Sequence, residues 1–238
     1  MPTADPAAQA RLEAALPAAL ARITATPGVY ATLWCGSAAR GEADEHSDLD
    51  FHALVRGDHR WRGSFVVDGV PVEVFHNPVR KVRAMFAAPD HATVAIFAQG
   101  RPVIPHPDLT ALVAEAGATY AAGPAPRPLT PAERHMLLDE VIEARSLVRD
   151  EMHALVALNA AGRLIRALYA ARGWWEVKPR AWLRDLEQHA APEADLLRRV
   201  STVPMPAQRQ AALEALALAV LPEGLTYGES TTEPQRVP

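Results

Sequence analysis

Two aspartates stand two residues apart at the start of an apolar run, in the order Ser47-Asp48-Leu49-Asp50. If this run forms a β-strand, Asp48 and Asp50 point to the same face, because successive side chains alternate. Two carboxylates roughly 4 Å apart repel each other by about 4 kcal/mol at an effective dielectric constant of about 20. A fold keeps such a pair when a shared proton, an arginine or lysine, or a metal ion neutralises it. Hard divalent cations such as Mg²⁺ prefer these oxygen ligands.

An earlier apolar run ends at Gly36-Ser37, and small residues follow it. Glycine has no Cβ, so the backbone at Gly36 can approach a ligand closely. Ser37 can cap the helix that follows, and the free N–H groups at a helix N-terminus bind anions. A turn of this kind that faces metal-binding carboxylates describes a nucleoside triphosphate site.

A third acid, Glu73, is the only charged residue in the apolar run 70–75. The segment before it ends in Asp68-Gly69, a strong signal for a β-hairpin. The hairpin can place the Glu73 strand beside the strand of Asp48 and Asp50. The alternative is that the aspartates are solvated loop residues and Glu73 points outward from its strand.

The combination of Gly36-Ser37, Asp48-x-Asp50 and Glu73 resembles the nucleotidyltransferase superfamily, which includes DNA polymerase β and the antibiotic nucleotidyltransferases. The resemblance covers roughly residues 28–118 and implies an α+β domain with a small mixed sheet flanked by helices. It implies that the three acids are catalytic and hold one or two Mg²⁺ ions, with Mn²⁺ as a possible substitute. It also implies that Gly36 and Ser37 hold phosphate oxygens.

Two further residues, Arg40 and Ser47, complete the nucleotide-binding set expected near this turn. Arg40 is either a phosphate contact or a surface cation beside a helix. Ser47 is expected to brace the start of the aspartate strand. His52 falls on the same face as the aspartates and is either a partner of the acids or a packed sheet residue.

The composition limits the classes of function. The 238 residues carry a formal net charge of -4, so no general basic field attracts nucleic acid, which argues against a template-directed polymerase. One cysteine excludes an internal disulfide framework and a cysteine-based zinc site. No apolar run is expected to reach the roughly 18 residues of a membrane span, and no signal peptide is apparent. We therefore expect a soluble, cytoplasmic protein.

The chain is expected to form two domains. Residues 1–120 would form the nucleotidyltransferase catalytic domain, and the four prolines of 121–131 favour an extended linker. Residues 132–222 would form an all-α helical bundle, and 223–238 a disordered tail. In the bundle, helices are expected over 131–150, 152–172, 179–189, 193–201 and 206–220.

The stretch 172–183 of the helical half resembles the helical domain of bacterial small-molecule nucleotidyltransferases, in which a tryptophan and a Lys-Pro pair lead into a helix. The resemblance implies that Lys178 reaches the triphosphate and that Trp174 and Trp175 help to bind the acceptor. The alternative is that the tryptophans are anchors of the core. A general base is expected from Glu73 or from an acid of this half, and the candidates there are Asp139, Glu140, Glu143 and Glu151, with Glu140 and Glu143 also assigned to acceptor binding.

These expectations lead to one function and two rivals. The chain would transfer a nucleoside monophosphate, AMP from ATP by resemblance, to a hydroxyl of a small molecule such as an aminoglycoside or lincosamide-like antibiotic, at a cleft between the domains. The first rival is an antitoxin-type nucleotidyltransferase that AMPylates a protein partner. The second is a non-catalytic, nucleotide-binding regulatory protein.

Overall fold

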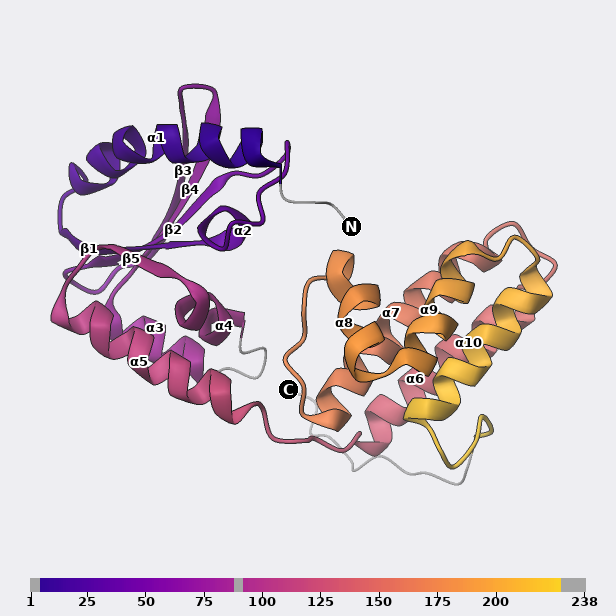
Figure 1. The fold of residues 1–238 in the computed structure, drawn as a ribbon. Helices are drawn as coiled ribbons and strands as arrows, with labels where there is room; N and C mark the ends of the chain where they lie inside the picture. The colour runs from indigo at the N-terminus through magenta and orange to yellow at the C-terminus, as the bar shows by residue number, and fades with distance from the viewer. Residues whose placement is uncertain (1–4, 88–91, 228–238) are drawn as a thin grey trace. The chain divides into compact units, whose positions relative to one another are not determined.

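A computed structural model describes residues 5–87 and 92–227, which divide into two compact units between Ala122 and Gly123. The first unit combines a mixed five-stranded sheet with helices, and the described part of the second contains helices without strands (Figure 1). The predicted fold class, an α+β domain followed by a helical bundle, is confirmed. The sequence of residues 78–98 predicts a helix with a break near Pro89-Asp90, and this break lies outside the described residues.

The first unit is built on a sheet with the strand order β3-β4-β2-β1-β5. β2 and β4 are parallel, and the other neighbouring strands are antiparallel. The elements in chain order are α1 (Pro6–Thr24), β1 (Val29–Cys35), α2 (Gly36–Ala39), β2 (Leu49–Val55), β3 (Trp61–Val67), β4 (Val70–Asn77), α3 (Val79–Phe86), α4 (Ala92–Gln99), β5 (Arg101–Ile104) and α5 (Pro107–Ala122).

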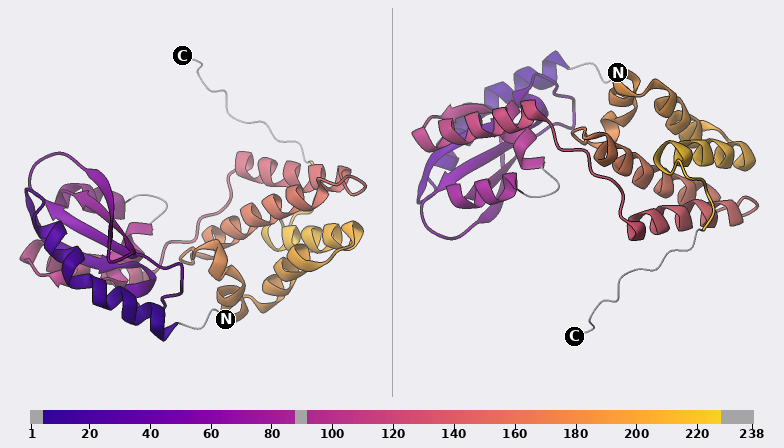
Figure 2. Two further views of the ribbon diagram at one scale, coloured as in Figure 1. Left: turned by 90° about the horizontal axis from the view of Figure 1, so that it is seen from above. Right: turned by 90° about the horizontal axis from the view of Figure 1, so that it is seen from below.

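Helices cover both faces of this sheet. α1 lies across one face, and α3, α4 and α5 lie across the other (Figures 1 and 2). α1 begins where the Asp5 side chain accepts a hydrogen bond from the Ala7 N–H and Pro6 fills the first helical position. Its apolar stripe, with Leu12 fully buried, packs against Phe51 of β2. The alternate residues of β2, including Asp50, therefore point toward the opposite face.

The hairpin of β3 and β4 sets the register that matters for Glu73. Asp68 and Gly69 both have positive φ, +49° and +74°, as a two-residue hairpin turn requires. The turn pairs Ser64 with Glu73 and Arg62 with Phe75, so these four side chains share one face of the sheet.

The second unit packs its helices around a separate core. The core includes Leu164, Tyr169, Leu186 and Leu213. The elements are α6 (Pro131–Ser146), α7 (His153–Arg172), the 3-10 helix η1 (Pro179–Ala181), α8 (Trp182–His189), α9 (Ala191–Thr202) and α10 (Pro206–Val220).

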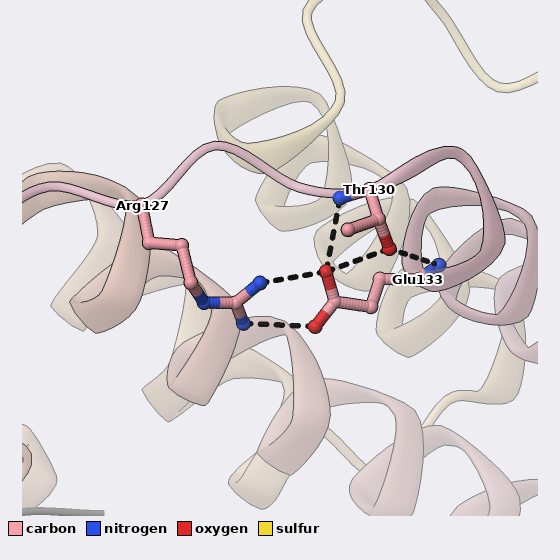
Figure 3. Close-up of polar contacts among 3 residues, drawn as sticks. All are labelled: Arg127, Thr130 and Glu133. Atoms are coloured by element: carbon pink, nitrogen blue, oxygen red, sulfur yellow. Dashed lines mark hydrogen bonds and ion pairs between the residues drawn. The ribbon is translucent and has the colours of Figure 1, made fainter. Parts of the chain in front are cut away.

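The start of α6 is fixed by a capping box. The Glu133 N–H donates to Thr130 Oγ1 at 3.2 Å, and the Thr130 N–H donates back to Glu133 Oε2 at 2.9 Å (Figure 3). Arg127 adds two hydrogen bonds of 2.8 Å to the same carboxylate. The Arg127 bonds, together with the bond from the Thr130 N–H, lower the pKa of Glu133 to about 2.

The predicted disordered tail requires a correction for its first residues. Glu223 pairs with Arg134, Leu225 packs against the helical core, and the Tyr227 hydroxyl donates to Asp139 Oδ1 at 2.6 Å. An apolar side chain and two polar contacts thus hold residues 223–227 against the helices, although their composition is polar. Residues 228–238 lie outside the described part of the chain.

Arg163 and Arg166 interrupt the apolar sequence of α7, so this helix contains no uninterrupted apolar run of about 18 residues, but it does have the length and average composition of a membrane span. α7 has 20 residues with a mean hydropathy of 1.2, and it is the one helix of the described residues that meets this criterion. Ala160, Leu164 and Leu168 on this helix are buried in the core of the second unit. Packing inside the bundle accounts for its apolar composition.

Candidate active site

The end of β1 and the start of β2 bring the predicted glycine corner to the predicted acids. Asp50 is paired with Cys35, the last residue of β1, on one side and with Glu73 of β4 on the other. Parallel neighbours lie about 4.8 Å apart and point to the same face. Asp50 and Glu73 therefore stand side by side, as predicted from the apolar patterns of their strands.

Gly36 is required at the corner for two independent reasons. Its φ is +80°, a conformation that L side chains rarely adopt. A Cβ at this position would also lie 2.3 Å from Asp50 Oδ2, far inside van der Waals contact. The absence of a side chain at Gly36 thus gives the Asp50 carboxylate its place against the backbone of the turn.

Ser37 and Ser47 hold the two ends of the turn together. Their hydroxyl oxygens lie 3.2 Å apart. Ser47 donates its hydroxyl hydrogen to Asp44 Oδ1 at 2.9 Å, and the Asp44 N–H donates to Ser47 Oγ at 2.9 Å. Because Ser47 has only one hydroxyl hydrogen, Ser37 is the donor between the two serines. The buried Ser47 thus braces the approach to β2.

Glu73 has a partner that the sequence reasoning did not identify. Arg62 of β3 pairs with Glu73 through its guanidinium and also lies over the Phe75 ring, 5.2 Å from the ring centroid. The Glu73 side chain is 19% exposed, whereas that of Arg62 is 65% exposed. An arginine therefore neutralises one of the two neighbouring carboxylates, which was one of the three possibilities considered for such a pair.

The carboxylates of Asp48, Asp50 and Glu73 meet some of the requirements of a divalent cation site and fail others. Asp50 and Glu73 supply the carboxylate oxygens that Mg²⁺ prefers, and Asp48 lies directly before β2 in a half-buried position. Within residues 5–87 and 92–227, however, no group of three or more His, Cys, Asp or Glu side chains is placed to hold a metal ion. The types of these residues fit the ion. The side chains of Asp48, Asp50 and Glu73 do not converge on one point, however, and Arg62 forms an ion pair with Glu73.

The remaining candidates of the first unit have local partners. Arg40 pairs with Glu42 at 2.9 Å. His52 is buried between the Phe75 and Phe97 rings, and burial lowers the pKa of His52 to about 4. His52 is therefore a neutral, packed sheet residue at neutral pH.

The candidates of the second unit lie around the end of α7 and the start of α8. Lys178 is exposed immediately before η1. Trp174 packs against the helical core, with its ring edge-to-face to Tyr169 at a centroid distance of 6.0 Å. This packing favours the core-anchor alternative for Trp174, and Trp175 is half-buried beside it.

Two acids assigned to the acceptor lie on α6. Glu140 pairs with Arg163 at 2.7 Å, and burial raises the pKa of Glu140. Its Oε2 is buried without a hydrogen-bond partner among the described residues. Glu143 is exposed.

Two site residues escaped the sequence reasoning, Arg62 and Asp44. Arg62 was accessible in principle, because the two-residue turn at Asp68-Gly69 defines the hairpin register and makes Arg62 a diagonal neighbour of Glu73. Asp44 precedes Ser47 by three residues, a spacing at which aspartate and serine bond locally in turns.

The first strand of the mixed sheet ends in a glycine corner beside paired acids, and a helical unit follows the sheet domain in the chain. The crystal structure of a nucleotidyltransferase-like protein from Exiguobacterium sibiricum 255-15 matches this chain with a TM-score of 0.50. The two chains are 12% identical, and the match covers 89% of this chain and 75% of the other. At this identity the likeness concerns the fold alone. Neither a protein-family model nor a curated protein matches the sequence.

Proposed function

We propose that this protein transfers a nucleoside monophosphate from a nucleoside triphosphate to a hydroxyl of a small molecule. The observation that supports the proposal best is that Gly36, Asp50 and Glu73 lie together. Asp50 and Glu73 are neighbours on adjacent strands, and the Asp50 carboxylate fills the space that a side chain at Gly36 would need. AMP as the transferred group, ATP as its donor and an antibiotic of the aminoglycoside or lincosamide type as the acceptor rest on the family resemblance.

In the proposed reaction the glycine corner binds the triphosphate. Gly36 offers backbone without a side chain. The Ser37 hydroxyl, which donates to Ser47 in this structure, would have to release Ser47 in order to donate to a phosphate oxygen. Lys178, which is exposed in the second unit, would supply a further cation for the triphosphate. The acceptor hydroxyl would attack the α-phosphorus, and pyrophosphate would leave on the opposite side.

Asp48, Asp50 and Glu73 are the proposed ligands of Mg²⁺, for which Mn²⁺ could substitute. A bound ion would neutralise the triphosphate and the leaving pyrophosphate. Arg62 competes for Glu73, so Glu73 becomes available as a ligand only when this ion pair opens. The chain's own contribution is to hold Asp50 against Gly36 and Glu73 beside it in register.

The acceptor hydroxyl has to lose a proton, and Glu140 is the best-supported base in the helical unit. Burial raises the pKa of Glu140, which makes its carboxylate a better proton acceptor than an exposed one. Its neighbours Asp139 and Glu143 on α6 add negative charge.

The proposal is tested by Asp50→Asn. With ATP, Mg²⁺ and a panel of hydroxyl acceptors, we expect pyrophosphate release to fall by about a hundredfold or more. The melting temperature should stay the same or rise, because the substitution relieves repulsion from Glu73. Asp68→Asn is the matched control: it makes the same chemical change in the hairpin turn, where asparagine tolerates the positive φ of +49°.

Two results would contradict the proposal. The first is an Asp50→Asn protein that is folded and retains full turnover. The second is a wild-type protein that binds no nucleoside triphosphate in calorimetry with Mg²⁺ present, which would return the chain to the non-catalytic alternative.

A further inference from the structure

The first unit has an open surface depression of about 400 Å³ away from the candidate active site, called the cavity below. Its walls come from the start of β1, the end of β2 and the first residues of α3 and α5. Asp50 lies near the start of β2, whereas Val55 at the end of the strand lines the cavity. Five residues of extended chain separate the two by about 17 Å, so one small ligand cannot contact both places.

Arg56 supplies an available positive charge at this cavity. Its side chain is exposed, and in the part of the chain that the structure describes no carboxylate forms an ion pair with it. The guanidinium carbon lies 5.1 Å from the centroid of the Tyr30 ring, and the Arg56 N–H donates to the Gly28 carbonyl at 3.0 Å. The second contact is made by the backbone amide and holds the main chain of Arg56. The ring contact keeps the guanidinium at the cavity without consuming its hydrogen-bond donors.

A second arginine and the start of α3 also line the cavity. The charge of Arg80 is balanced by an ion pair with the Asp58 carboxylate, and its guanidinium also donates to the Asp58 carbonyl at 3.4 Å. The first turn of α3 contains no acid, and no side chain caps its N–H groups. Val79, the first residue of this helix, also lines the cavity. Arginine forks of this kind are the usual recognition groups for phosphate.

One acid limits which anions fit. Asp108 lines the cavity and accepts a hydrogen bond of 3.0 Å from the Tyr30 hydroxyl. Burial and the bond to Asp108 raise the pKa of Tyr30 to about 12, so Tyr30 remains a donor and Asp108 an acceptor at neutral pH. The Asp108 carboxylate can accept further hydrogen bonds from hydroxyl groups, and its negative charge would repel a purely anionic ligand.

We propose that this cavity binds a small phosphorylated sugar, with the phosphate at Arg56 and Arg80 and the sugar hydroxyls at Asp108. This site is separate from the candidate active site and does not depend on the proposed transfer reaction.

The test measures binding of ribose 5-phosphate and of inorganic phosphate by calorimetry in EDTA, where divalent cations are absent. We expect the wild-type protein to bind ribose 5-phosphate more tightly than phosphate, because only the sugar reaches Asp108. Arg56→Gln should weaken the binding of both ligands by about tenfold. Arg80→Gln should weaken it as well, which gives a second variant if the first does not fold.

The controls separate this site from its surroundings and from the candidate active site. Arg83 lies on α3, as Arg80 does, but it pairs with Glu115 and does not line the cavity, so Arg83→Gln is a matched control. Arg83→Gln and Asp50→Asn should both change binding by less than about twofold. The proposal is overturned if the wild-type protein binds neither ligand below about 10 mM, or if Arg83→Gln weakens binding as much as Arg56→Gln. Loss of binding in Asp50→Asn would place the ligand at the candidate active site instead.

Discussion

Gly36 and Asp50 form a contact in which backbone conformation and side-chain position depend on each other. The positive φ of Gly36 turns the chain at the end of β1, and its missing Cβ leaves room for Asp50 Oδ2. A residue with a side chain would meet both a conformational cost and an overlap with the carboxylate. Because Asp50 is bounded on its other side by Glu73, it has little freedom to move away.

Gly36→Ala should therefore destabilise the protein more than the conformational cost alone. We expect a loss of about 1 kcal/mol from the backbone and about 1–3 kcal/mol more from the overlap, measured by urea denaturation. Gly41→Ala is the matched control, because Gly41 also has a positive φ, +74°, but an added Cβ would meet nothing within 4 Å. Equal losses in the two variants would show that Asp50 does not pack against Gly36.

Arg62 changes how the acid pair is understood at the residue scale. In its presence one carboxylate of the pair is neutralised without a metal ion. The pair with Glu73 is open to solvent on the arginine side, so its contribution to stability is small. Breaking the Arg62–Glu73 ion pair so that a metal ion can bind Glu73 therefore costs little free energy. This is compatible with Glu73 acting as a metal ligand.

At the scale of elements, the start of α6 shows how one carboxylate can organise a chain segment. Glu133 accepts hydrogen bonds from Arg127 and from Thr130, which precedes the helix (Figure 3). The ionised form of Glu133 makes all of these bonds, and protonation weakens them. The folded-state pKa of Glu133 is therefore lowered from its ordinary value of 4.5 to about 2.

This shift predicts a pH dependence of stability. An acid whose pKa is lower in the folded protein stabilises the fold above its unfolded pKa and loses this effect as pH falls through the folded value. At pH 7 we expect Glu133→Gln to lose about 1 kcal/mol, and the difference from wild type should shrink as pH falls from 4.5 toward 2. Glu151→Gln, which changes an exposed acid of the turn before α7, should show almost no loss. A loss for Glu133→Gln that is constant down to pH 2 would contradict the assignment.

At the scale of the whole molecule, each unit has its own hydrophobic core. Leu12 and Phe51 belong to the core between α1 and the sheet, and Leu164 belongs to the core of the helical unit. The two sets share no residue. The apolar residues of α7 that give it the composition of a membrane span are part of the helical core.

Truncation of one core should act on its own unit. Leu164→Ala removes a fully buried side chain and should cost about 3 kcal/mol. In hydrogen-exchange measurements, amides of α7 and α10 should exchange faster while those of β1 and β2 keep their protection. Leu158→Ala, at a 42% exposed position of the same helix, should change little. Faster exchange of the β-strands in Leu164→Ala would mean that the two units unfold together.

Local signals in the sequence determined much of this protein. Asp68-Gly69 predicted the hairpin. The residue types of Asp5-Pro6 and of Thr130 with Glu133 likewise indicate two helix starts, because caps and turns depend on a few neighbouring residues. The family resemblance carried by Gly36-Ser37, the aspartates and Glu73 implied the fold class of the first unit. The sequence could not give the contacts of residues 223–227, because these depend on side chains of α6 far away in the chain.

Only the tertiary structure decided how the acids are neutralised. Parallel pairing of β2 with β4 placed Asp50 beside Glu73, and the hairpin register brought Arg62 to Glu73. No local pattern specifies an ion pair that depends on two strand registers at once. For the same reason the cavity at the far end of β2 has no motif: Arg56, Arg80 and Asp108 come from three separate elements, and folding alone brings them together.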